Sequence, residues 1–216
     1  MTELITKYYD NGRMKSQYSY LNGVKNGSCV KKYYSGYFKM ECYFVNGVKN
    51  GPFKTYYDRG EMKSKGSYYN GSITGFYKEW YENGYLKIKC YFGDGELNGP
   101  YKKLYKDGKK KVKAVYLNGE LNGTYKKYYK NGNKEYVENS DGLYEYYYEN
   151  GQISKKYNKI DYKFNGLYQE WYENGNKEIE CNYSNNKKEG LYKEWYEDGN
   201  KLKEVNFLKS ITVFKE

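Results

Sequence analysis

The most informative absence in this sequence is histidine, because imidazole is the usual general base near neutral pH. The chain also has no Gly-x-Ser-x-Gly motif and no glycine-rich phosphate loop followed by a helical pattern. Its four cysteines include no Cys-x-x-Cys pair, which together with the missing histidine argues against a zinc site. We therefore expect a protein that is not an enzyme and that uses no cofactor and no metal.

Aliphatic side chains are also scarce. Leu, Ile, Val and Phe make up 36 of 216 residues, and with a formal net charge of +11 this composition alone is typical of disorder. However, 34 Tyr and 3 Trp recur in register, and aromatic rings bury large areas, so we predict a folded chain with an aromatic core. No apolar run approaches the ~20 residues of a membrane-spanning helix, and the first residues do not resemble a signal peptide. We expect an intracellular, cytoplasmic protein.

What the sequence does contain is an internal repeat. Residues 190–199 read Gly-Leu-Tyr-Lys-Glu-Trp-Tyr-Glu-Asp-Gly, and close copies lie at 75–84 and 166–175. With the first glycine as position 0, position 6 is tyrosine and position 9 is glycine in all nine copies. The copies are 24 residues apart, except for one spacing of 19. They begin at Glu3, Gly27, Gly51, Gly75, Gly99, Gly123, Gly142, Gly166 and Gly190.

Each copy predicts a β-hairpin. Large and polar side chains alternate over six residues, and Glu-Asp-Gly or Glu-Asn-Gly then predicts a tight type I′ turn with positions 8 and 9 as its loop. A second turn, such as 22–27, is expected to be longer. The predicted fold is all-β: an elongated, twisted single antiparallel sheet, a β-meander solenoid of about nine 24-residue hairpins. It spans 1–216 as one array, with a weak seam at 133–165 and a capping strand at 207–216 that covers the last edge.

The turn also predicts strand register. If positions 8 and 9 form the loop, the positions of facing residues sum to 17, so position 2 faces position 15 and position 6 faces position 11. Large rings then face small residues, as in Tyr77 with Cys90. In the second copy the same pair is Cys29 and Cys42, where a cross-strand disulfide is geometrically feasible. Two reduced thiols that fill space are the preferred interpretation for an intracellular protein.

Aromatic residues at positions 5 and 6 are the candidate binding site. Neighbouring residues on a strand point to opposite faces, so one column is expected in the core and the other partly exposed. Exposed rings with lysines between them are typical of protein-binding hot spots or of stacking platforms for single-stranded nucleic acid. Packing without any ligand is the preferred interpretation of either column taken alone. The candidate residues are Tyr57, Trp80, Tyr81, Tyr105, Tyr128, Tyr129, Tyr147, Tyr148, Trp171, Tyr172, Trp195 and Tyr196.

The repeat at 190–200, and the later Tyr-x-Asn-Gly at 68–71, resemble the MORN repeat. More closely, they resemble its bacterial variant, which occurs in proteins described as antitoxins of toxin–antitoxin systems. The resemblance covers essentially the whole chain and is poorest at 133–165. It implies an elongated, curled β-sheet without catalytic residues, which binds proteins or, in some relatives, acidic phospholipids.

These observations together predict a non-catalytic, protein-binding repeat scaffold, of the antitoxin or immunity type, that binds and masks a partner. The alternative is a binder of anionic surfaces, either acidic phospholipid heads or nucleic acid, because the net charge is +11 and lysines flank the rings. Because every copy contains lysines, a solvated surface that protects the sheet edges is the preferred interpretation of this charge over a dedicated anion site. No small-molecule substrate is expected, and exposed end strands leave end-to-end pairing of copies open.

Overall fold

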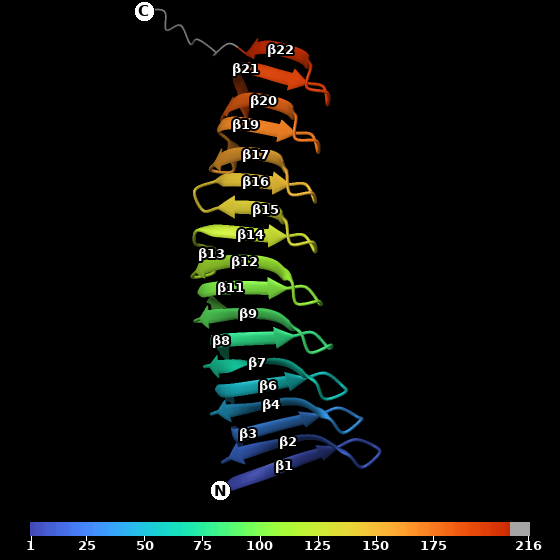
Figure 1. Ribbon diagram of the computed structural model, residues 1–216. Coiled ribbons are helices and arrows are strands. Elements are labelled where there is room, and N and C mark those ends of the chain that lie inside the picture. Colours follow the sequence, from blue (N-terminus) through green and yellow to red (C-terminus); the bar gives the residue numbers. More distant parts are fainter. Residues whose placement is uncertain (208–216) are drawn as a thin grey trace, which may run out of the picture. The chain divides into compact units, whose positions relative to one another are not determined.

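The computed structural model describes residues 1–207, and every regular element in that range is a β-strand. No helix that could span a membrane is present among these residues. The chain divides into two compact units, 1–122 and 123–216, of which the second is described as far as Phe207. Within each unit, successive strands lie beside one another in chain order and run antiparallel (Figure 1).

The first unit contains thirteen strands, of which three are two-residue arms at the second turns. They are β1 (Thr2–Tyr8), β2 (Met14–Leu21), β3 (Val24–Lys32), β4 (Phe38–Val45), β5 (Val48–Lys49), β6 (Gly51–Tyr56), β7 (Met62–Tyr69), β8 (Ser72–Trp80), β9 (Leu86–Gly93), β10 (Glu96–Leu97), β11 (Gly99–Leu104), β12 (Lys110–Leu117) and β13 (Glu120–Leu121). The second unit has nine described strands. They are β14 (Thr124–Tyr128), β15 (Lys134–Asn139), β16 (Leu143–Tyr147), β17 (Ile153–Ile160), β18 (Lys163–Phe164), β19 (Gly166–Trp171), β20 (Lys177–Ser184), β21 (Lys187–Trp195) and β22 (Lys201–Phe207).

The predicted fold class, an all-β antiparallel meander of hairpin repeats, is confirmed. The predicted register of positions 2 and 15 is also correct, because Tyr77 faces Cys90 in one hairpin and Cys29 faces Cys42 in another. A large ring thus lies opposite a small side chain, and the volume across the ladder stays nearly constant. Because side chains alternate along each strand, every second side chain lies on the same face of the sheet.

The first turn differs from its prediction. Tyr81 at position 6 does not face position 11; a bulge shifts the register, so that Trp80 at position 5 faces Leu86. The Gly84 amide donates to the Tyr81 carbonyl at 2.9 Å, and φ is positive only at Gly84, where it is 82°. This is a type I turn that ends in a left-handed glycine rather than a type I′ turn. Position 6 is therefore the first turn residue, not a strand residue.

The second turn is where the type I′ geometry occurs. Asn70 and Gly71 have φ values of 47° and 87°, and the flanking Tyr69 and Ser72 face each other. Contrary to the prediction, this turn is shorter than the first. The turn was expected to be longer because the sequence between the two regular strand segments includes a bulge after the turn. In this bulge Gly75, at position 0, has a φ of 71°. An Asn-Gly pair supplies two positive φ values at little cost, which is what a two-residue hairpin requires.

The core lies on the face that carries positions 2 and 15. Its rings include Phe53, which packs with Cys29 and Cys42, but the most buried side chains are small, with Cys29 only 1% and Cys42 2% exposed. All four cysteines are free thiols. The aromatic core predicted from composition is thus a set of partly buried rings around small buried residues.

The boundary between the two units falls at 122/123, ahead of the seam predicted at 133–165. Inside that range the shortened copy replaces the two-residue turn by a type I turn, in which the Gly142 amide donates to the Asn139 carbonyl at 3.0 Å. This substitution accounts for the lost residues without breaking the pairing of β15 with β16. The capping strand predicted at 207–216 lies outside the described residues except for Phe207, which ends β22.

Candidate binding surface

The invariant tyrosine at position 6 connects one repeat to the next. The Tyr57 hydroxyl donates a 2.8 Å hydrogen bond to the Trp80 carbonyl, and the same bond recurs along both units at 2.7–2.9 Å. We call this set the tyrosine ladder; its donors are Tyr9, Tyr33, Tyr57, Tyr81, Tyr129, Tyr148 and Tyr172. Because the acceptor is a backbone atom, only the donor has to be kept in the sequence.

The two predicted aromatic columns are neither core nor fully open. Tyr57, Tyr81, Tyr105, Tyr129, Tyr148 and Tyr172 at position 6 are half-buried, whereas Tyr196 is exposed. Trp80, Tyr128, Tyr147, Trp171 and Trp195 at position 5 are also half-buried. Position 6 lies in the first turn rather than in the strand, because the bulge shifts the register. Their role in binding stays a prediction, and their packing role is visible in the structure.

A row of lysines crosses the first unit at positions 3 and 14. On β6, β7, β8, β9, β11 and β12, each lysine has another lysine as its Cα partner on the neighbouring strand. We call this row the lysine ladder; it consists of Lys54, Lys65, Lys78, Lys89, Lys102 and Lys113. Lys78 is half-buried and the other five are exposed. None of the six forms an ion pair with a residue that the structure describes.

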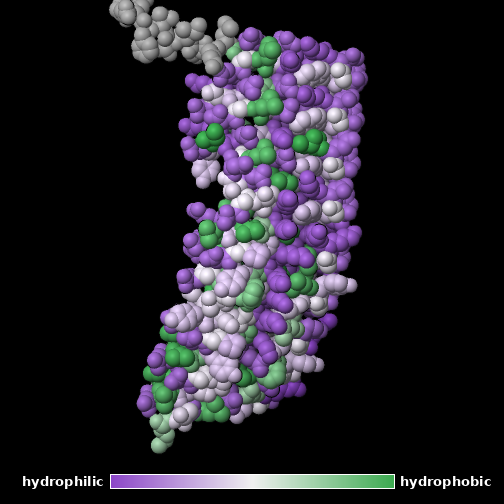
Figure 2. Space-filling view, turned by 60° about the vertical axis from the view of Figure 1, so that its left-hand side comes forward, coloured by the Kyte–Doolittle hydropathy of each residue, from purple (hydrophilic) through white to green (hydrophobic). Residues whose placement is uncertain are grey.

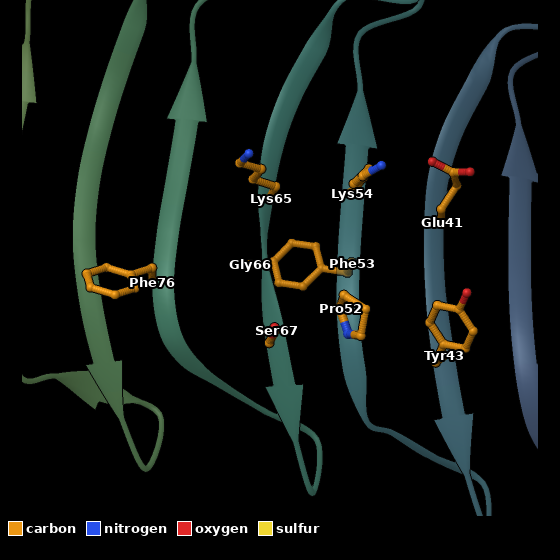
Figure 3. A pocket seen from close by; sticks show the side chains of 9 residues that line it. All are labelled: Glu41, Tyr43, Pro52, Phe53, Lys54, Lys65, Gly66, Ser67 and Phe76. Carbon is orange, nitrogen blue, oxygen red and sulfur yellow. The ribbon is translucent and has the colours of Figure 1, made fainter.

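A second row lies beside the lysine ladder on the same face. Figure 3 shows Lys54 and Lys65 side by side with Glu41, while Tyr43, Pro52, Ser67 and Phe76 form a row next to them. These residues line a groove of about 370 Å³. We call the large side chains at positions 1 and 16 the apolar strip; they are Tyr43, Pro52, Phe76, Tyr91, Pro100 and Val115.

The apolar strip is open to solvent. Phe76 is 68%, Tyr43 49% and Tyr91 38% exposed, and the rings of Phe76 and Tyr91 meet edge to face at 5.2 Å. A second groove of about 340 Å³ continues the surface, where Phe76 and Pro100 lie next to Lys89 and Lys102. On the face seen in Figure 2, hydrophilic side chains predominate and hydrophobic ones form small separate groups. The two grooves thus combine lysines with narrow apolar contacts.

The second unit has the same row with a different charge pattern. Counting from β15, facing residues are Val137, Glu145, Lys156, Gln169, Glu180, Lys193 and Glu204. Lys156 pairs with Glu145 at 3.0 Å, and Gln169 donates to Glu180 at 2.9 Å. Opposite charges thus stabilise this row, as usual for facing strand residues. The fold accepts either pattern, so the lysine ladder is not a requirement of the repeat.

Two titratable groups near this surface have raised pKa values. Burial, with the hydrogen bond to Glu41, raises the pKa of the Tyr56 hydroxyl to about 12. Burial also raises the pKa of the Cys90 thiol to about 11, so this thiol stays protonated near neutral pH. No group of three or more acidic or cysteine side chains that could hold a metal occurs among the described residues. The arrangement holds charges and flat apolar groups in fixed register.

Comparison with known families matches the MORN repeat variant to five segments, at residues 49–70, 121–139, 140–158, 164–185 and 188–209. Five of the nine repeats are therefore similar to the MORN repeat variant. A comparison with curated proteins found no significant match. MORN repeats form scaffolds that bind protein partners or membrane lipids. The matched segments therefore indicate a binding role and do not specify the kind of partner.

The matched segments correct one expectation. Residues 133–165, expected to be the poorest part of the resemblance, are largely matched, whereas 1–48 and 71–120 are not. The unmatched stretch 71–120 carries four of the six ladder lysines: Lys78, Lys89, Lys102 and Lys113. Sequence reasoning missed this row, although the predicted register already placed Lys54 opposite Lys65. The signal was the repetition of lysine at positions 3 and 14 in three consecutive copies.

Proposed function

We propose that this protein is a non-catalytic scaffold that binds an anionic partner through the lysine ladder of its first unit. The observation that carries the proposal is the row of six facing lysines, none of which forms an ion pair with a described residue, although Glu41 faces Lys54 at one end of the row. Attraction between such a row and a negatively charged surface is strong and falls with salt. An intracellular location belongs to this proposal as well.

The test is binding of the full chain to heparin, used as a generic polyanion, at increasing salt. We expect Lys65→Gln/Lys89→Gln to weaken binding and to reduce its salt dependence. The matched control is Lys156→Gln/Lys193→Gln, which removes the same charge from equivalent positions of the second unit. Equal effects of the two double variants would mean that net charge, not the ladder, is responsible, and the proposal would be wrong.

A second candidate is a protein partner bound by the second unit, as in the masking of a toxin by an antitoxin. Its support is the exposure of Leu167 and Leu191, which occupy position 1 on β19 and β21, the strands on which Gln169 and Lys193 face Glu180. Co-purification from the native host with the wild-type chain and with Leu167→Asp/Leu191→Asp tests it. A specific partner should be lost with the double variant; a partner retained by it would exclude this surface.

A further inference from the structure

We propose that the lysine ladder and the apolar strip together bind single-stranded nucleic acid. The phosphates would follow the lysines, and bases would stack on the exposed rings of Tyr43, Phe76 and Tyr91. This inference rests on the proposed function, since it names the anionic partner of the same surface.

The geometry of the ladder suits a linear polyanion. Six lysines lie on strands that neighbour one another, so five strand spacings of about 4.8 Å separate the first from the last by roughly 24 Å. That length corresponds to roughly seven phosphates at about 3.4 Å each, and to fewer in an extended strand. A nucleic-acid backbone carries one sign of charge at regular intervals, as this row does, whereas a protein surface usually mixes both signs.

The lysine ladder destabilises the fold, and the repeat can form without it. Like charges directly opposite each other destabilise a sheet, and the ladder contains five such contacts between Lys54 and Lys113. The second unit builds the same row with Glu145 facing Lys156 instead. A partner that neutralises the lysines accounts for a pattern that packing leaves unexplained.

The apolar strip distinguishes a single strand from a duplex. Positions 1 and 3 of a strand point to the same face about 7 Å apart, which places Phe76 next to Lys78 on β8. Sheet-based binders of single strands combine a basic track for the backbone with exposed rings on which unpaired bases stack. The bases of a duplex are stacked and paired with each other and do not offer their faces to such rings.

The experiment measures binding of the full chain to a fluorescein-labelled thymidine 12-mer by anisotropy between 50 and 200 mM salt. A hairpin duplex of the same length, polyglutamate, inorganic polyphosphate and vesicles with anionic lipid serve as competitors. We expect the single strand to bind at least about 10-fold more tightly than each competitor. The logarithm of the binding constant should fall with that of salt, by about 0.7 for each lysine engaged.

Three variants separate the two rows. Lys65→Gln/Lys89→Gln should reduce the salt slope by about 1.4, since two phosphate contacts are removed, and Lys156→Gln/Lys193→Gln should leave it unchanged. Phe76→Leu keeps an apolar side chain but removes the ring; because its side chain is 68% exposed, the fold should persist. We expect Phe76→Leu to weaken binding about 5-fold or more with an unchanged salt slope.

The outcomes distinguish this inference from the proposed function. Equal binding of the single strand and polyphosphate, with no effect of Phe76→Leu, would overturn the inference and keep the anionic partner. Preference for the duplex, for polyglutamate or for vesicles would also overturn the inference and keep the proposed function. It would identify a different class of anionic partner. Binding to none of these polyanions would overturn both.

Discussion

The Tyr57 hydroxyl donates a 2.8 Å hydrogen bond to the carbonyl oxygen of Trp80, which lies 23 residues further along the chain. Tyrosine is invariant at this position because a phenylalanine of the same shape lacks the donor. The bond joins two neighbouring hairpins, in addition to their strand pairing and to ring contacts such as that of Phe53 with Tyr77. It therefore holds the first turn of one repeat to the strand end of the next.

Tyr57→Phe should lower the free energy of unfolding by about 1 kcal/mol, because one intramolecular hydrogen bond to a partly buried carbonyl is lost. Urea denaturation followed by circular dichroism measures this. Tyr69→Phe is the matched control, since Tyr69 is 62% exposed, and should change stability little. Equal losses from the two variants would contradict a structural role for the tyrosine ladder.

Tyr162 occupies a turn position that glycine or asparagine fills elsewhere, and its φ is 62°. A bulky residue in the left-handed region costs about 1–2 kcal/mol, of which the greater chain entropy of glycine offsets a part. We expect Tyr162→Gly to raise the free energy of unfolding by roughly 0.5–1 kcal/mol. Its side chain is almost fully exposed, so no packing is lost; a destabilised variant would contradict this account.

Gly142 and Gly166 both start a repeat with positive φ, of 90° and 86°. A Cβ at Gly142 would lie 2.0 Å from the backbone oxygen of Lys159, whereas one at Gly166 would meet nothing within 4 Å. Gly166→Ala should cost about 1 kcal/mol, from φ alone. Gly142→Ala must also move backbone, so we expect a clearly larger loss, with exchange of β15–β17 amides accelerated. Similar melting temperatures would show that β16 and β17 readily move apart.

Stability should fall steeply at alkaline pH. Burial is the first cause that raises the pKa of Tyr56, Tyr77 and Tyr192 to about 12, against about 10 in an unfolded chain. A tyrosine whose pKa is raised by folding stabilises the folded state fully below pH ~10. This stabilisation is lost as the pH rises towards ~12. Denaturation at pH 8, 10 and 11, with tyrosinate absorbance, measures the fall. Tyr77→Phe should flatten it; an unchanged slope would exclude Tyr77 as a contributor.

The lysine ladder should weaken the fold at low salt. Lys89 faces Lys78 on one side and Lys102 on the other, so Lys89→Gln should stabilise by roughly 0.2–1 kcal/mol. The gain should disappear in about 1 M salt, where the screening length is about 3 Å. Lys156→Gln, which loses the 3.0 Å pair with Glu145, should not stabilise. A destabilising Lys89→Gln at low salt would mean that the ladder lysines do not repel one another.

Much of this fold could be predicted from the sequence, because the columns of identical residues in a repeat show where the turns lie and which residues face each other. The identical columns located the turns, and the facing of Tyr77 with Cys90 followed from the count of residues between them. The same count placed Lys54 opposite Lys65, so the lysine ladder was within reach of sequence reasoning.

What could not be predicted depends on contacts between hairpins. Glu-Asn-Gly fits a type I′ turn or a type I turn with a left-handed glycine, and only the bulge before Trp80 separates them. That bulge puts Tyr81 into the turn, where its hydroxyl reaches the Leu104 carbonyl. Alternation within a strand cannot anticipate this, because the acceptor belongs to the next repeat and is a backbone atom.

All bonds of the tyrosine ladder point the same way along the chain, from an earlier repeat to a later one. Excision of residues 51–74 would bring Tyr33 to the carbonyl of Trp80 in place of that of Tyr56, with the same chemistry on both sides of the junction. Repeats of the first unit are therefore exchangeable modules. Duplication or loss of one module would lengthen or shorten the track of lysines by two, without any new interface having to evolve.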